Sequence, residues 1–193
     1  MARDRANRPE ARSLRLFVAI RLSAEAEAAV ERAVEPLLGA FPKARWVPTE
    51  NRHVTAKFLG QTWPRLETWV RERVGEAAAS CPPFETRLTN LGAFPARGKA
   101  RVLWVGLDDH AGRMAEVAHA LDAALVKEFK PETRPFAPHL TVARSDPPLA
   151  LPDGFATTPI EPVTFRVDRI TLFRSHLQRP APRYEDLGEF PLG

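Results

Sequence analysis

The sequence predicts an α+β fold that is built largely from antiparallel sheets. Segments with helical and with strand-like periodicity are both present, but they do not alternate in the regular order that a parallel sheet requires. Several strand-like segments instead follow one another directly, as they do in hairpins. Hydrophobic residues make up 44% and charged residues 27% of the 193 residues, which is typical of a globular protein with a substantial core.

Each expected element has its own local signal. Segment 13–22 reads SLRLFVAIRL and is rich in β-forming residues. A helix should follow it, because Ser23 is a favourable N-cap, Glu25 and Glu27 stand in the first turn, and Gly39 comes at the end. Apolar spacing predicts two more helices at 63–80 and 110–129. The remaining strands are expected within 44–60 and at 84–95, 100–107, 137–145 and 162–175, and the C-terminal segment begins extended.

The domain organisation is expected to be simple. Residues 1–12 are charged and read as a flexible basic tail, and residues 13–193 contain no linker, so they should form a single domain. The chain has no apolar run of the roughly 20 residues that a membrane span needs, and its first residues lack the apolar segment of a signal peptide. The single cysteine, Cys81, excludes an internal disulfide and a cysteine-built metal site. We therefore expect a cytoplasmic protein.

The charge of the chain comes mostly from arginine. Its net charge is +4, and it has 23 arginines and five lysines among the 28 basic residues. Arginine binds phosphate through two parallel hydrogen bonds, so the excess is compatible with a phosphate or nucleic-acid partner. A general compositional bias towards arginine, alanine and proline would explain it equally well.

Two short segments repeat one pattern. In RHVTAKFLG (52–60), His53 and Thr55 share one face of the expected strand, because side chains alternate along a strand. In PHLTVAR (138–144), His139 and Thr141 repeat this spacing 86 residues after the first histidine. Both copies lie in β-rich stretches and have apolar residues on the opposite face, which indicates a weak internal duplication.

This pattern suits acid–base chemistry at phosphorus. Histidine is the side chain whose unperturbed pKa lies nearest neutrality, so one imidazole can accept a proton while a second donates one. The threonine hydroxyls can donate hydrogen bonds to phosphate oxygens where negative charge builds up. The alternative is that these residues are polar side chains on the solvated faces of two strands.

Other chemistries find little support in the sequence. No HExxH motif or cysteine cluster is present, and no acidic residue stands at a recognisable spacing as a third metal ligand beside His53 and His139. No GxSxG motif is present, and Cys81 is followed by two prolines at the expected end of a helix. No phosphate-binding GxxxxGK[ST] loop occurs, so we expect no bound metal, no ATP and no other cofactor.

The chain resembles the 2H phosphoesterases, and within them the RNA 2′,3′-cyclic phosphodiesterases, also called 2′-5′ RNA ligases. Two segments carry the resemblance most specifically, because ENRHVTAKFLG and RPFAPHLTVAR resemble the two His-x-Thr-x motifs of that family in their order. The flanking segments that also resemble it are RLFVAI, GAFP, RVLWVGL, ITLFRS and RYEDLGEFPL. The resemblance implies a two-lobed α+β domain over 13–193, with an antiparallel sheet in each lobe, flanking helices and a central cleft between the motifs.

The resemblance also implies an activity. The substrate would be an RNA end with a 2′,3′-cyclic phosphate, which water opens to a 2′-phosphate. His53 would protonate the 3′ leaving oxygen, and His139 would activate the water. Thr55 and Thr141 would bind the phosphate. In that family an arginine after the second motif and an aromatic residue in the opening strand bind substrate, so Arg144 would bind the phosphate and Phe17 would stack on a base.

Strand alternation adds two expectations to these roles. Lys57 has the parity of His53 and Thr55, so it should point at the same cleft and contact the phosphate. Arg144 has the opposite parity to His139 and Thr141, so it can reach the cleft only if the strand ends or bulges after Val142.

Alternatives within and outside the enzyme class stay open. The same site could join RNA ends through a 2′-5′ bond without ATP, using a 5′-hydroxyl in place of water. A non-catalytic module that binds RNA ends is a further possibility. The expected partner in every case is RNA, and the protein is expected to be a monomer.

Overall fold

The computed structural model describes residues 13–193, and the expected tail at 1–12 lies outside these described residues. Strands are β1 (Leu14–Ile20), β2 (Arg45–Trp46), β3 (Val54–Thr62), β4 (Phe84–Phe94), β5 (Ala100–Leu107), β6 (His139–Leu149), β7 (Thr164–Val167), β8 (Arg169–His176) and β9 (Arg183–Pro191). The α-helices are α1 (Ala24–Ala40), α2 (Glu67–Ala79) and α3 (Arg113–Leu125). No helix in this part of the chain has the length and apolar character needed to cross a membrane.

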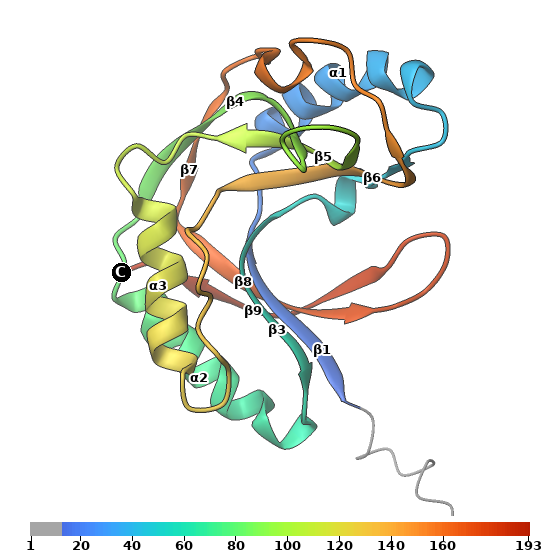
Figure 1. Ribbon diagram of the computed structural model, residues 1–193. Helices are drawn as coiled ribbons and strands as arrows, with labels where there is room; N and C mark the ends of the chain where they lie inside the picture. The colour runs from blue at the N-terminus through green and yellow to red at the C-terminus, as the bar shows by residue number, and fades with distance from the viewer. Residues whose placement is uncertain (1–12) are drawn as a thin grey trace, which may run out of the picture.

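The strands form one curled sheet in which every pairing is antiparallel (Figure 1). Its order is β7-β4-β5-β6-β3-β1-β8-β9, with β2 added to β6. The two halves of the sheet, one ending in β6 and the other in β3, are joined through a single residue pair, Val54 with Leu140. This arrangement confirms the α+β class and the largely antiparallel sheets that the sequence predicts.

The chain crosses from one half of the sheet to the other within the segment for which the sequence predicted either one long strand or two. The segment expected as 162–175 divides at Asp168 into β7 and β8. Strand β7 pairs with β4 in the first half of the sheet, whereas β8 pairs with β1 in the second. The same apolar run therefore contributes an edge to one half and an inner strand to the other.

Helix α1 begins where its sequence signals predict, whereas α2 and α3 begin four and three residues after the starts of the expected segments 63–80 and 110–129. The Ser23 hydroxyl accepts a hydrogen bond from the backbone N–H of Ala26 at 3.2 Å, which caps α1. Helices α2 and α3 pack against each other, and they cover one face of the half that contains β3, β8 and β9. Fully buried side chains such as Leu16, Leu121 and Leu172 fill the space between these helices and the sheet. The opposite face of β1 and β3 is left uncovered by these helices (Figure 1).

Candidate active site

The two His-x-Thr segments meet where the halves of the sheet join. Val54 and Leu140 are cross-strand partners, and both are fully buried. Because the pairing is antiparallel, the neighbours of the Val54–Leu140 pair run in opposite directions. His53 is therefore nearer to Thr141, and His139 is nearer to Thr55. All four polar residues have the opposite parity to the buried pair, so they share one face of the sheet. We call this face, which carries His53, Thr55, His139 and Thr141, the motif face.

Both imidazoles are held in the same way. His53 Nδ1 lies 2.8 Å from the carbonyl oxygen of Asn51, and His139 Nδ1 lies 2.8 Å from the carbonyl oxygen of Ala137. A carbonyl only accepts hydrogen bonds, so each Nδ1 carries the proton and donates it. In the neutral form of either ring, Nε2 is therefore the unprotonated nitrogen, which can accept a proton from a substrate or water and return it.

The position of His53 is fixed by the residues that precede it. Asn51, whose carbonyl holds the ring, donates its own side-chain N–H to the carbonyl of Pro182 at 2.7 Å in the connection between β8 and β9. The buried Arg52 pairs with Glu31 of α1, with 2.6 Å between Nη1 and Oε2. Residues from two distant elements thus anchor the short 3-10 turn at Thr49–Asn51 that leads into β3.

The surroundings of His53 favour its neutral form. Its ring lies 4.8 Å from the Phe17 ring and 5.4 Å from the Tyr184 ring, measured between centroids. The pKa of His53 is lowered to about 4, chiefly by burial and to a smaller extent by the positive charges of Arg21 and Arg144, although the bond to Asn51 opposes this effect. His53 is therefore neutral at pH 7 in the free protein.

His139 lies among different aromatic side chains. The Phe94 ring contacts it edge-on, with 5.1 Å between centroids, and the Trp104 ring is 6.3 Å away. Trp104 is the cross-strand partner of Thr141, and it lies over Gly92, where any Cβ would collide with the indole. Gly92 is thus required for the Trp104 ring to reach its place beside His139.

In each motif strand, the residue directly after the threonine is an extra residue that resets the alternation of side chains. Along β3, Thr55 pairs with Ala19 and Lys57 pairs with Val18, so Ala56 has no partner and forms a β-bulge. Along β6, Thr141 pairs with Trp104 and Ala143 pairs with Leu103, so Val142 forms the equivalent bulge. In each strand, the residue five positions after the histidine consequently lies on the motif face.

In β6 this residue is Arg144. Alternation allows Arg144 to reach the site only if the strand ends or bulges after Val142. The bulge lies one residue earlier, at Val142 itself, and it has the same effect on Arg144. Arg144 is exposed, and its charge acts on both His53 and Tyr184. The structure therefore brings Arg144 together with the two histidines and two threonines on the motif face.

The prediction for Lys57 is wrong. The bulge at Ala56 turns Lys57 to the opposite face, where its side chain is only 5% exposed and pairs with Asp122 of α3. Its Nζ also donates to the carbonyl of Lys130 at 3.2 Å, and Asp122 accepts from the N–H of Glu132 at 3.1 Å. Lys57 therefore ties β3 to α3 and to the segment before His139, and it does not face the phosphate site.

The expectation for Phe17 also needs correction. Its side chain lies on the motif face but is only 3% exposed, because it stacks on Phe173 at 5.0 Å and packs under His53. Its ring faces are therefore covered and cannot take a base. Phe58, which strand alternation does not place on this face, is 63% exposed and lies 6.0 Å from Phe17. The same condition that was considered for Arg144, a bulge in the strand, would have pointed to Phe58 if it had been applied to the first motif.

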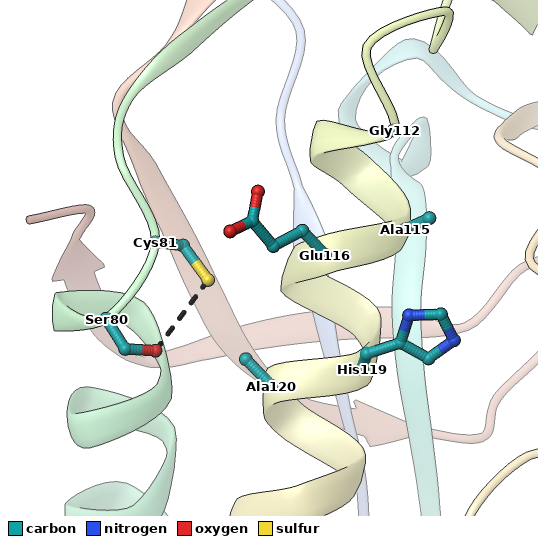
Figure 2. A pocket seen from close by; sticks show the side chains of 7 residues that line it. All are labelled: Ser80, Cys81, Gly112, Ala115, Glu116, His119 and Ala120. Atoms are coloured by element: carbon teal, nitrogen blue, oxygen red, sulfur yellow. Dashed lines mark hydrogen bonds between the residues drawn. The ribbon is translucent and has the colours of Figure 1, made fainter.

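A separate cavity lies between the end of α2 and the start of α3, away from the motif face (Figure 2). Cys81 and Glu116 line it, and His119 points away from Cys81 in this view. Burial raises the pKa of the Cys81 thiol, which makes it a poor nucleophile. Within residues 13–193, no three His, Cys, Asp or Glu side chains come together in a group that could hold a metal ion.

A family model, described as the 2′-5′ RNA ligase superfamily, matches residues 22–179. The chain belongs to the 2′-5′ RNA ligase superfamily. This confirms the family that the two motifs suggest. Because the matched region begins before the first motif and ends after the second, it contains both histidines and both threonines.

Several curated relatives in this superfamily carry the name RNA 2′,3′-cyclic phosphodiesterase. One from Geobacillus stearothermophilus is 32% identical over 179 residues, which cover 91% of this chain but only 56% of the length of that relative. One from Methanothermobacter thermautotrophicus is 31% identical over 185 residues, which cover 93% of this chain and 99% of the relative.

Solved structures share the fold. A protein from Thermus thermophilus aligns with a TM-score of 0.80 at 27% identity, and the alignment covers 92% of this chain and 97% of that one. E. coli LigT in complex with 3′-AMP aligns with a TM-score of 0.77 at 26% identity, covering 93% and 98%. These similarities confirm the 2H phosphoesterase fold that the sequence predicts.

Proposed function

We propose that this protein hydrolyses 2′,3′-cyclic phosphates at RNA ends to 2′-phosphates. The observation that carries the proposal is the arrangement of His53 and His139 on either side of the Val54–Leu140 pair, each with Nδ1 held by a carbonyl and Nε2 free. Two imidazoles on one face, with a hydroxyl near each, suit an in-line displacement at phosphorus. The names of the superfamily relatives support the same substrate. A 2′,3′-cyclic phosphate requires a 2′-hydroxyl, so the chemistry itself selects RNA.

The reaction needs one proton removed and one delivered. His139 Nε2 accepts a proton from water as the water oxygen attacks phosphorus. The bond from phosphorus to O3′ breaks on the opposite side, and His53 delivers a proton to O3′. Thr55 and Thr141 donate hydrogen bonds to the non-bridging oxygens, and the Arg144 guanidinium neutralises the charge that builds up there.

This assignment requires the substrate to change the protonation of His53. Burial keeps His53 neutral in the free protein, with a pKa of about 4. A bound cyclic phosphate carries a negative charge, and a negative charge beside an imidazole raises its pKa. His53 would therefore take up its proton together with the substrate.

Phe58 provides a surface for the terminal base. Its ring is 63% exposed on the same face as Thr55, with only Ala56 and Lys57 between them in the chain. Base stacking on an aromatic ring depends little on base identity. We therefore expect Phe58, rather than Phe17, to stack on the base next to the cyclic phosphate.

The direct test is a product assay on a nucleoside 2′,3′-cyclic phosphate. We expect the wild type to release the 2′-phosphate, and turnover should persist in the presence of a chelator. His53→Ala and His139→Ala should each abolish turnover while far-UV circular dichroism stays unchanged. A 3′-phosphate product would reverse the assignment of acid and base, and turnover by the double variant would contradict the proposal.

The same variants separate two other activities. Incubation with paired RNA halves, followed by analysis of the linkage, would reveal 2′-5′ joining, which uses a 5′-hydroxyl in place of water. Binding of RNA ends without formation of a hydrolysed or joined product would instead indicate a module that binds the terminal phosphate but does not catalyse a reaction. The monomeric state and the cytoplasmic location stay predictions from the sequence.

A further inference from the structure

The motif face continues beyond His53 along β1 and β3 as a strip of exposed side chains. Phe58 is 63% exposed and Trp63 is 56% exposed. Between them lie Gln61 and Arg15, which are cross-strand partners and are both exposed. We call Arg15, Phe58, Gln61 and Trp63 the Phe58–Trp63 strip.

The register places all four side chains of the strip on one face. Phe58 pairs with Phe17, and Gln61 pairs with Arg15, two residues before Phe17 in β1. The neighbouring Thr62 points to the other face, where it is 1% exposed. Trp63 follows with an extended backbone, φ −66° and ψ 136°, so the alternation returns its side chain to the face of Gln61.

The charge of the strip favours a polyanion. Arg15 forms no ion pair with any residue in 13–193, and the strip contains no carboxylate. Arg15 also lies close enough to Tyr184 for its charge to act on the phenol, against the burial that raises the pKa of Tyr184. A guanidinium thus stands between two exposed aromatic rings and beside the residues that surround His53.

The length of the strip exceeds one nucleotide. Leu59 has no partner in β1, so Phe58 to Gln61 spans only the two residues from Phe17 to Arg15. Trp63 follows Gln61 by two positions, and four strand steps of about 3.3 Å correspond to roughly 13 Å. One nucleotide at Phe58 would therefore leave Trp63 uncovered. Exposed aromatic rings that alternate with basic side chains are the surfaces on which single-stranded nucleic acids bind.

We propose that the Phe58–Trp63 strip binds the single-stranded RNA on the 5′ side of the cyclic phosphate. A base upstream of the terminal nucleotide stacks on Trp63, and Arg15 contacts the backbone phosphate between them. This inference rests on the proposed function for the position of the RNA end. It adds that the protein distinguishes an RNA strand from a single cyclic nucleotide.

The test compares substrates of different length. The value of kcat/KM is measured for a cyclic mononucleotide and for single-stranded oligonucleotides of two to six residues with the same 2′,3′-cyclic end. We expect kcat/KM to increase with length in the wild type. In Trp63→Ala, the ratio of the oligonucleotide value to the mononucleotide value should fall about tenfold, because stacking of one base contributes about 1–3 kcal/mol.

Binding of an oligonucleotide with a 2′-phosphate end gives a second measurement that needs no turnover. Arg15→Gln should weaken this binding and reduce the slope of log Kd against log salt by about 0.7, as expected for the loss of one phosphate contact to a single strand. Leu38→Ala removes an apolar side chain on α1 that is 42% exposed, and it serves as the matched control.

Each outcome bears on one proposal. If the wild type hydrolyses the mononucleotide and the oligonucleotides equally well, or if Trp63→Ala and Arg15→Gln behave like Leu38→Ala, the strip does not bind RNA. If neither substrate is hydrolysed but both variants weaken oligonucleotide binding, the strip is supported and the proposed activity fails. A strip that serves a protein partner would give no dependence on RNA length, and this result would also overturn the inference.

Discussion

Phe58 and Arg144 occupy equivalent positions in the two halves of the sheet. Each stands five residues after a motif histidine, and each reaches the motif face because a single extra residue, Ala56 or Val142, bulges its strand. The two halves thus share a geometry but present different chemistry, an aromatic ring in one and a guanidinium in the other. Under the proposed function, Phe58 would bind the terminal base in one half and Arg144 would bind the phosphate in the other.

Arg144→Ala should lower kcat/KM by about 100-fold or more, because a charged donor to the transition state is lost. Arg144→Lys should recover only part of this loss, since an ammonium cannot form two parallel bonds to a phosphate. Steady-state kinetics on a 2′,3′-cyclic nucleotide measure both effects. Arg101→Ala is the control, because this exposed arginine of β5 pairs with Asp146. Equal losses in the Arg144 and Arg101 variants would contradict a specific role for Arg144.

Phe58→Ala should raise KM for a cyclic nucleotide about tenfold, because a stacked base is worth about 1–3 kcal/mol. Phe58→Trp should keep the wild-type KM, since the indole offers a larger ring face. Val126→Ala, at a side chain that is 57% exposed at the end of α3, serves as the control. An unchanged KM in Phe58→Ala would show that the terminal base lies elsewhere.

The partly buried His53 should make the fold sensitive to acid. Its pKa of about 4 in the folded protein is below the value of about 6.5 expected for the unfolded chain. Between these values only the unfolded state binds the proton, so the free energy of unfolding falls as the pH falls, by about 1.4 kcal/mol per pH unit. Urea unfolding between about pH 4 and pH 7 measures this slope. His53→Gln should flatten it, whereas the exposed His119→Gln should leave it unchanged.

The pH dependence of the kinetics tests the role of His53 directly. The profile of kcat/KM reports the free protein, and that of kcat reports the complex. If His53 is the acid, the alkaline limb of kcat should lie at higher pH than the alkaline limb of kcat/KM, because the bound phosphate raises the pKa of His53. An acidic limb near pH 4 in kcat/KM, with no such displacement, would instead identify His53 as the base.

The buried pair of Lys57 and Asp122 should matter more for stability than for substrate binding. Lys57→Ala leaves the Asp122 carboxylate, which is 14% exposed, without its partner, and should lower the free energy of unfolding by about 3–5 kcal/mol. The double variant Lys57→Met with Asp122→Leu should recover most of this loss, because no unpaired charge remains.

Urea unfolding of the single and double variants measures the coupling between Lys57 and Asp122. Arg113→Ala is the matched control, since it breaks a surface pair with Glu116 and should cost less than about 1 kcal/mol. A loss in Lys57→Ala no larger than in Arg113→Ala would argue that the pair contributes nothing to the fold.

The sequence alone predicted the elements and the central residues of the candidate site. Alternation places His53 with Thr55 and His139 with Thr141, and this holds in the structure because neither bulge lies between a histidine and its threonine. The caps and apolar spacing likewise predicted the three helices to within a few residues. These features depend on local backbone geometry, which a single segment determines.

Tertiary pairing decided the orientation of the residues after each threonine. A bulge appears only when a strand is aligned with its partner, so the register of β1 against β3 turned Lys57 towards Asp122 and brought Phe58 to the surface. The register of β5 against β6 likewise brought Arg144 to the motif face. Residues before the bulges could be assigned from alternation, whereas those after them depended on contacts with strands distant in the sequence.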